Sequence, residues 1–266
     1  MNKLPLPSVK KIIAIASGKG GVGKTTVTVN LALALQALGL KIGIFDADIY
    51  GPNVPLMLGV RRKMDGEAFV PVVRRSDAPP YINPLERFGL QVMSTGLLVS
   101  ESQVISPLSD GVGRLVLQTM KDTLWNELDY LLLDLPPSAG QPQQALIQHV
   151  QLAGVIIVTT PQSMSLLDAS RACQHFQNHS INIMGVVENM SYVICKSCGE
   201  KTPIFAQPGE ERPANLETQT LLYQIPLDPS FSKRISPQHP LLQSNPSGLQ
   251  ADTFLELART VHDAVE

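Results

Sequence analysis

The clearest pattern along the chain is a series of short apolar segments, rich in β-branched residues, which alternate with patterns typical of helices. The segments span residues 11–17, 41–48, 90–95, 129–137, 154–160 and 181–190. Continuous apolar runs of this length are typical of strands buried on both faces, as in a parallel sheet that lies between helices. The alternation therefore predicts an α/β fold, with a mostly parallel sheet and helices on both faces.

Helix signals follow the first strand and close the chain. A helix is expected over residues 25–38, and Gly39 is well placed to end it because glycine readily takes a positive φ. Residues 249–266 have apolar positions at helical spacing and predict an amphipathic helix. The first strand and helix then form a tight crossover to the second strand.

Two long stretches interrupt the alternation, at about residues 61–87 and at about residues 192–250, where the paired cysteines lie. Loops of this length inside a compact domain usually carry function, so we expect partner contacts there. The chain has 266 residues and no compositional division in its middle. Residues 1–266 are therefore interpreted as a single domain.

Charge and composition narrow the expected partners. The formal net charge is −2, so no overall field attracts nucleic acid or anionic lipid, and small ligands and proteins are expected instead. The first apolar segment is too short to span a membrane and no cleavage-site pattern follows it, which predicts a cytoplasmic protein. Three cysteines suit a reducing compartment, and Cys173, in a predicted helix, is interpreted as a packed apolar residue.

The strongest chemical signal is the sequence G-K-G-G-V-G-K-T, which follows the first strand and opens the first helix. In that context it predicts a phosphate-binding loop, whose glycines let backbone N–H groups converge on phosphate oxygens at a helix N-terminus. Lys24 is expected to reach the β- and γ-phosphates, and the Thr25 hydroxyl to bind Mg²⁺. Lys19 is one lysine more than such a loop needs. The nucleotide-binding residues predicted here are Gly18, Lys19, Gly20, Gly21, Val22, Gly23, Lys24, Thr25 and Thr26.

Aspartates stand at the ends of two predicted strands. Asp46 and Asp48 follow the second strand, at the edge where ligands bind in open α/β sheets. One of them can hold Mg²⁺ indirectly while the other orients the attacking water, although Asp46 could instead only anchor the turn. Asp134 ends a strongly apolar strand, which is the usual place for a carboxylate that supports Mg²⁺.

Cys195 and Cys198 are separated by two residues, a spacing that lets both sulfurs bind one metal. A [4Fe–4S] cluster takes four cysteine ligands, so one chain supplies half of them and a symmetric dimer could supply the rest at its two-fold axis. Gly199 suits the tight backbone reversal of a metal knuckle. From spacing alone, an Fe–S cluster, a zinc ion, a redox dithiol and two idle thiols all remain open.

Taken in order, these motifs resemble a known family. The chain resembles the Mrp/ApbC family of iron–sulfur cluster carrier ATPases, in which the same motifs occur in the same order. These motifs are the loop with its extra lysine, DADIYGPNVP, DLPPSAG, TTPQ, VVENMSY, CKSCGE and IPLDP. That family lies in the deviant phosphate-loop class, together with the nitrogenase iron protein and the MinD and ParA ATPases. The resemblance implies a cytoplasmic homodimer that binds ATP and Mg²⁺, hydrolyses ATP slowly and holds a labile [4Fe–4S] cluster between its subunits. The implied partners are cluster-assembly proteins and apo iron–sulfur proteins, with neither nucleic acid nor membrane.

The resemblance also implies roles for single residues. Lys19 would point across the dimer to the phosphates bound by the other subunit, and Asp48 would position the attacking water. Asn189 would read adenine, with Pro226 and Asp228 along the base. Cys195 and Cys198 would be the Fe–S ligands.

The chain departs from the family's pattern in places, and other members of the class remain alternatives. Ser138, Ala139 and Gln141 stand where the family commonly has Gly, Thr and Asp, which bears on the rate of hydrolysis. A positioning ATPase like MinD or ParA would need a basic amphipathic tail or a DNA-binding patch, but the tail here is acidic. An electron-transfer reductase would have its cluster cysteines far apart in sequence.

Overall fold

The structure is a computed structural model that describes residues 3–60, 72–73, 81–98, 111–137, 139–195, 197–205, 212–227 and 249–265. Its centre is an eight-stranded sheet in the order β12-β9-β8-β1-β7-β2-β6-β5. Neighbouring strands run parallel except β5 and β6, which are antiparallel. The strands are β1 (Val9–Ala16), β2 (Ile42–Asp46), β5 (Leu85–Arg87), β6 (Leu90–Ser94), β7 (Leu128–Asp134), β8 (Gly154–Thr159), β9 (Ile183–Glu188) and β12 (Leu221–Gln224). The predicted α/β fold is confirmed.

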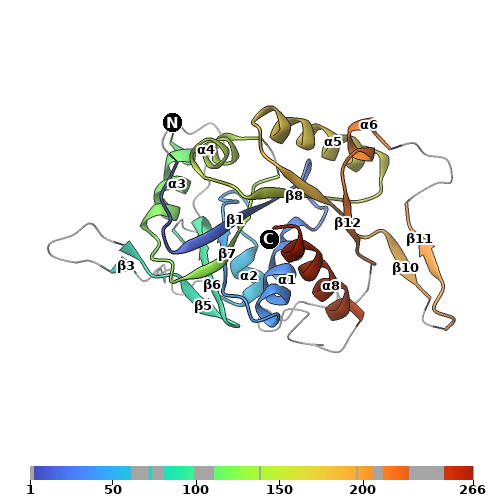
Figure 1. Ribbon diagram of the computed structural model, residues 1–266, viewed down its shortest axis with the longest axis horizontal. Helices are drawn as coiled ribbons and strands as arrows, with labels where there is room; N and C mark the ends of the chain where they lie inside the picture. The colour runs from blue at the N-terminus through green and yellow to red at the C-terminus, as the bar shows by residue number, and fades with distance from the viewer. Residues whose placement is uncertain are drawn as a thin grey trace.

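Helices cover both faces of this sheet (Figure 1). The helices α1, α2 and α8 pack on one face, and α3, α4 and α5 pack on the other. Their bounds are α1 (Lys24–Ala37), α2 (Val54–Leu58), α3 (Val112–Asp122), α4 (Gln141–His149), α5 (Ser163–Asn178), α6 (Ala214–Glu217) and α8 (Leu249–Asp263), with a short 3₁₀ helix at Thr95–Leu97.

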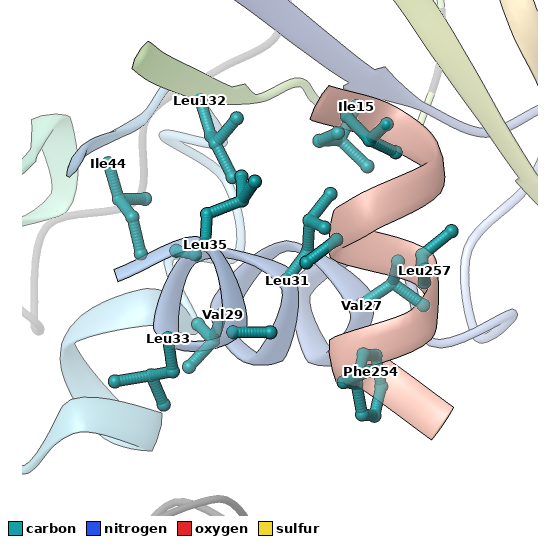
Figure 2. Close-up of a cluster of buried hydrophobic side chains, with 14 of the residues drawn as sticks. Ile15, Val27, Val29, Leu31, Leu33, Leu35, Ile44, Leu132, Phe254 and Leu257 are labelled. Atoms are coloured by element: carbon teal, nitrogen blue, oxygen red, sulfur yellow. The ribbon is translucent and has the colours of Figure 1, made fainter. Parts of the chain in front are cut away.

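The continuous apolar strands are explained by this layering. Successive side chains of a strand point to opposite faces, so Ile13 and Ile15 of β1 join the core under α1 and α8, while Ile12 and Ala14 join the core on the other face. Figure 2 shows the first of these cores, where Leu31 of α1 lies with Leu257 of α8 beneath the sheet. Each face of the sheet is thus buried by its own set of helices.

The first crossover follows the predicted pattern closely. The helix α1 begins one residue earlier than expected, at Lys24, and ends at Ala37. Gly39 then takes φ +90°, and its N–H bonds to the carbonyl of Gln36 as the chain turns toward β2. The amphipathic pattern at the end of the chain forms α8 over Leu249–Asp263.

The two stretches expected as long loops contain strands that the hydrophobic pattern did not predict. In the first, β3 (Val72–Val73) pairs with β4 (Tyr81–Ile82), and β5 adds an edge to the sheet. In the second, β10 (Tyr192–Ile194) and β11 (Lys201–Pro203) form a hairpin, and β12 becomes the opposite edge strand. These strands have two to four residues, which is too short for periodicity to distinguish from a loop.

Within the described ranges, the chain contains no helix that combines the length and the apolar character needed to cross a bilayer.

Candidate nucleotide and metal site

The predicted phosphate loop connects the end of β1 to the start of α1, and its glycines serve different purposes. Gly21 and Gly23 have φ of +84° and +86°, the left-handed region that favours glycine. Gly18 faces α5 so closely that a Cβ there would lie 2.2 Å from the backbone carbonyl of Asp168. Gly23 faces Asn189, whose Nδ2 would lie 2.2 Å from a Cβ. The loop is therefore fixed by neighbours on two sides.

Asp134, at the carboxyl end of β7, holds the start of α1 against the sheet. Its Oδ1 lies 2.7 Å from Lys24 Nζ and accepts a 2.8 Å hydrogen bond from the Thr28 hydroxyl. Its Oδ2 accepts a 2.7 Å bond from the Thr25 hydroxyl. The carboxylate is fully buried, and Lys24 is nearly so. Three donors, one of them the Lys24 ammonium, thus offset the cost of burying the carboxylate.

The arrangement around Asp134 fits a magnesium ion. The Thr25 hydroxyl donates its hydrogen bond to Asp134, so its oxygen lone pairs stay free to face a cation. Asp134, hydrogen-bonded to that hydroxyl, is placed to support the ion indirectly. The predicted magnesium residues Thr25 and Asp134 are therefore brought together.

Asp46 lies directly opposite Asp134 in the register of β2 and β7 and is fully buried. Its Oδ1 accepts the N–H of Asp48 at 3.1 Å, and its Oδ2 accepts the Ser94 hydroxyl at 3.0 Å. Burial raises the pKa of the Asp46 carboxyl well above its usual range, and the charge of Asp134 raises it further. This geometry favours the interpretation of Asp46 as the anchor of the turn.

Asp48 follows that anchor at the same edge of the sheet. Its Oδ1 accepts the N–H of Gly51 at 3.1 Å, and the side chain is largely buried. Burial raises the pKa of Asp48, whereas the nearby Lys24 ammonium lowers it. The Asp48 carboxylate is thus held in one orientation near Lys24 of the phosphate loop, where it can accept a hydrogen bond.

The remaining loop residues differ in exposure. Gly20 and Gly21 are exposed, Val22 is buried, and Thr26 is half-buried, with its carbonyl accepting a 2.8 Å bond from Asn30. Lys19 is half-buried, and its carbonyl accepts the Ser17 hydroxyl at 3.0 Å. In the part of the chain that the structure describes, the Lys19 ammonium has no ion pair.

Of the residues predicted along adenine, Asn189 contacts the phosphate loop at Val22 and Gly23. Asn189 directly follows β9, and its Nδ2 donates a 2.9 Å hydrogen bond to the carbonyl of Val22. Pro226 lies between Ile225 and Leu227, which pair through backbone hydrogen bonds with Ser191 and Tyr192. Asp228 lies outside the described residues. Asn189 is thus tied directly to the loop, and Pro226 is tied to the segment that follows Asn189.

The two cysteines lie at the turn of the β10–β11 hairpin, which projects from the body of the molecule (Figure 1). The Gly199 N–H bonds to the Cys195 carbonyl at 2.8 Å, with Gly199 at φ +75°, and the Cys195 N–H bonds to the Glu200 carbonyl at 2.9 Å. Both thiols are free, and Cys198 is exposed. Gly199 thus makes the tight backbone reversal that its position in the sequence suggested.

The surroundings of Cys195 favour its thiolate form. The Ser197 hydroxyl lies 3.0 Å from its sulfur, and this contact, followed by the N–H groups of Cys198 and Ser197, lowers the pKa of Cys195 to about 6. Cys173 is different, because burial in α5 raises its pKa to about 11. Among the described residues, no group of three or more His, Cys, Asp or Glu side chains is placed to hold a metal ion. A metal at Cys195 and Cys198 therefore needs ligands from elsewhere.

Two residues at this site were missed in the sequence. Thr28 stands one helical turn after Lys24 and reaches the same carboxylate, so helical spacing could have identified it. Ser94 is the polar residue that ends β6, at the same edge as Asp46. Its only signal was a hydroxyl at the end of an apolar strand, and that feature is too common among strands to mark a site.

The sequence is similar to those of known proteins. The model of the ParA family, described as NUBPL iron-transfer P-loop NTPase, matches residues 8–262. The iron-sulfur cluster carrier protein of Aquifex aeolicus is 39% identical over 98% of this chain and 70% of its own length. The carrier protein of the same name in Escherichia coli K12 is 38% identical over 98% of this chain and 68% of its own length.

Solved structures give the same picture of the fold. A nucleotide-binding protein from Archaeoglobus fulgidus, in complex with ADP, superposes with a TM-score of 0.67 at 32% identity, over 87% of this chain and 88% of that one. The cell division ATPase MinD of Pyrococcus furiosus superposes with a TM-score of 0.63 at 24% identity, over 96% of this chain and 99% of that one. The second likeness concerns the fold alone.

The contact between Gly18 and α5 predicts a steric difference within the loop. In Gly18→Ala the added Cβ would meet the Asp168 backbone, which has no flexible end to move, whereas in Gly20→Ala it would meet no atom within 4 Å. We expect Gly18→Ala to lower the free energy of unfolding by about 1–3 kcal/mol and Gly20→Ala to leave it nearly unchanged. Urea unfolding measures both, and equal losses would contradict the packing described for Gly18.

The thiol environment predicts a pH profile for alkylation. The thiolate is the reactive form, so the rate for Cys195 should be half-maximal near pH 6 and should fall below that pH as the sulfur gains a proton. In Ser197→Ala the midpoint should move upward, because the Ser197 hydroxyl is the largest cause of the lowered pKa. Iodoacetamide labelling read by peptide mass spectrometry gives the profile, with Cys173 as the unreactive internal control. A wild-type midpoint at about 8.5, the ordinary value for a free cysteine, would show that the turn does not stabilise the thiolate.

Proposed function

Because this chain belongs to the ParA family of iron-transfer P-loop NTPases, we propose that it is an ATPase that carries an iron–sulfur cluster and delivers it to apoproteins. The cargo is a [4Fe–4S] cluster held between two copies of the chain. The observation that carries the proposal is the pair of free thiols on a projecting hairpin whose base is tied to the phosphate loop. The names of the curated relatives support the same cargo.

The chain is a P-loop NTPase, and its residues suggest how it handles ATP. Thr25 would bind Mg²⁺, with Asp134 and Asp48 in support, and the ion would supply positive charge that offsets the charge of the phosphates. The Lys24 ammonium, now paired with Asp134, would turn to the phosphates, which compete with that carboxylate for it. Asp48, fixed by Gly51 and by the Asp46 anchor, would orient the attacking water.

Nucleotide contacts would continue across the loop. The backbone N–H groups from Gly18 to Thr26 would surround the phosphates at the start of α1. Asn189 and Pro226, with Asp228, would lie along adenine. Lys19 would act on the nucleotide of the other subunit, because a cation aimed at the transferring phosphoryl group stabilises the charge of the transition state. Its lack of an ion pair among the described residues is consistent with a partner outside its own chain.

The cluster assignment rests on the stoichiometry of ligands. Cys195 and Cys198 supply two thiols, a [4Fe–4S] cluster takes four, and a symmetric dimer provides the other two at its axis. The lowered pKa of Cys195 keeps its sulfur in the thiolate form that binds metal at neutral pH. Free thiols also suit a reducing compartment, so we infer a cytoplasmic location. The partners would be cluster-assembly proteins that load the dimer and apo iron–sulfur proteins that receive the cluster.

A structural zinc ion is the second candidate for the same cysteines. The tight turn closed by the Gly199 N–H on the Cys195 carbonyl leaves two cysteines at a spacing that zinc sites also use. Zinc would leave an ATPase with a fixed metal and nothing to transfer. Acid-labile sulfide in protein purified without air separates the two candidates, because only the cluster contains it.

The two lysines of the loop should have different effects on turnover. Lys24→Ala should abolish nucleotide binding, because Lys24 is the buried cation, now paired with Asp134, that would turn to the phosphates. Lys19→Ala should keep binding and lose about 10²-fold or more in kcat, because only the transition state uses the charge from the partner subunit. Nucleotide titration and single-turnover hydrolysis measure the two effects. Equal loss of binding in both variants would contradict the role of Lys19 across the dimer.

The cysteines should be equally necessary for the cluster and unnecessary for nucleotide. Cys195→Ser or Cys198→Ser removes two of four ligands from a symmetric dimer, so each alone should abolish [4Fe–4S] absorbance after anaerobic reconstitution with iron and sulfide. ATP binding should persist in both variants. The control is Cys173→Ser, which changes a buried thiol far from the hairpin turn and should retain the cluster. Retention of a full cluster in either hairpin variant would contradict the bridging assignment.

A further inference from the structure

A cavity lies at the edge of the sheet opposite the phosphate loop. Its volume is about 540 Å³, which is within the range of small-molecule sites. Its walls come from the segment before β1, the start of β1, the link between α4 and β8, the start of β9 and the two residues after α8. Because β1, β8 and β9 run parallel, their amino ends meet here, whereas β1 leads into the phosphate loop at its carboxyl end. The cavity is therefore separate from the nucleotide site.

The wall formed by residues 3–7 is held in place by hydrogen bonds. The Leu4 N–H bonds to the carbonyl of His149, the last residue of α4, at 2.6 Å. The Val9 N–H bonds to the Leu6 carbonyl at 3.0 Å. The two prolines of this segment restrict the backbone further, because the proline ring fixes φ. The wall is thus formed before a ligand binds, which lowers the cost of ordering the site.

Aliphatic side chains form the apolar part of the lining. Ile12 of β1 and Met184 of β9 both line the cavity and are buried in the protein. Leu6 and Leu152, which are half-buried, line it as well. Among the described residues around the cavity none is aromatic, so no ring is present to stack on a flat ligand. This part of the lining suits an aliphatic chain.

The charged residues that line the cavity are all lysines. Lys3, Lys10 and Lys11 line it, and none of the lining residues that the structure describes is acidic. Lys10 has a countercharge, because its Nζ lies 2.7 Å from Asp129 Oδ1. Lys3 and Lys11 form no ion pair within the described ranges of the chain. The cavity therefore carries positive charge that its described walls leave unbalanced.

Backbone carbonyls hold both of these unpaired lysines. Lys3 Nζ donates to the carbonyls of Ile147 and Gln148, each at 3.1 Å, and Lys11 Nζ donates to the Val265 carbonyl. A carbonyl fixes the position of an ammonium but does not neutralise its charge. Because an ammonium has three N–H donors, each of the two lysines keeps a donor for a ligand. Lys11 is also half-buried, so water screens its charge less than that of an exposed lysine.

We propose that this cavity binds a small aliphatic carboxylate. Lys11 would bind the carboxylate, Lys3 would add charge at the rim, and the chain of the ligand would pack on the aliphatic side chains of the lining. An inorganic anion would leave that apolar surface uncovered, and a neutral ligand would leave the two lysines without a countercharge. The proposal goes beyond the proposed function, because neither the nucleotide nor the cysteines take part in it.

The test is isothermal titration calorimetry of the full chain with ADP and Mg²⁺ present at saturation, so that an added anion does not bind in the phosphate loop. Octanoate has both a charge and a chain, acetate has only the charge, and octan-1-ol has only the chain. Octanoate should bind at least about tenfold more tightly than either of the others, because only octanoate uses both parts of the lining. Equal affinity for octanoate and octan-1-ol would overturn the proposal, and so would equal affinity for octanoate and acetate.

Variants of the lysines locate the binding. Lys11→Met removes the cation, keeps an unbranched side chain and should weaken octanoate binding by about tenfold to hundredfold, because a hydrogen bond between charged groups is lost. Lys11→Arg keeps the cation and should retain most of the affinity. The matched control is Lys121→Met, which removes an exposed lysine of α3 that does not line the cavity. If Lys11→Met does not fold, Lys3→Met changes an exposed side chain and should weaken binding by about two- to fivefold.

The outcomes separate this proposal from the proposed function. Unchanged octanoate affinity in a folded Lys11→Met, or an equal loss in Lys121→Met, would overturn the assignment of the cavity. If Lys3→Met has to replace Lys11→Met, unchanged affinity in Lys3→Met has the same meaning. A chain that bound no ADP would contradict only the proposed function, and octanoate titration without nucleotide would still test the cavity.

Discussion

The structure depends on one buried carboxylate. Asp134 ends β7, near the middle of the sheet, and it receives the Lys24 ammonium and the hydroxyls of Thr25 and Thr28 from the start of α1. Its carbonyl also accepts the N–H of Ala47 from the neighbouring strand. An unpaired charge at Asp134 would cost several kcal/mol. The partners of Asp134 therefore hold three parts in one relative position: the phosphate loop, α1 and the turn from Asp46 to Asp48, called here the aspartate turn.

The chemistry of the molecule gathers at one edge of the sheet for the same reason. Parallel strands bring their carboxyl ends together. At this edge, β1 leads into the phosphate loop, β2 leads into the aspartate turn, β7 ends at Asp134, and Asn189 follows β9. The cysteine hairpin starts from this edge and projects beyond it (Figure 1). The base of the cysteine hairpin therefore lies beside the phosphate loop, although the cysteines come about 170 residues after the loop in the chain.

Much of this could be predicted from the sequence, and the failures have physical causes. The long apolar strands, the phosphate loop and Gly39 were readable because each is a local pattern with one structural meaning. The short strands β5 and β12 could not be predicted, because their pairing is set by the neighbouring strand and not by an alternation of apolar and polar residues of their own. The contacts of Glu188 with Arg212 and of Asn189 with Val22 join residues far apart in sequence, and nothing local indicates such partners.

The central claim is that two copies of this chain share one cluster, and native mass spectrometry of the full chain, purified without air, tests it most directly. The account predicts a species of two chains that carries four irons and four sulfides, with no such cluster on single chains. A cluster-bearing single chain, or a dimer that holds zinc and no sulfide, would contradict it.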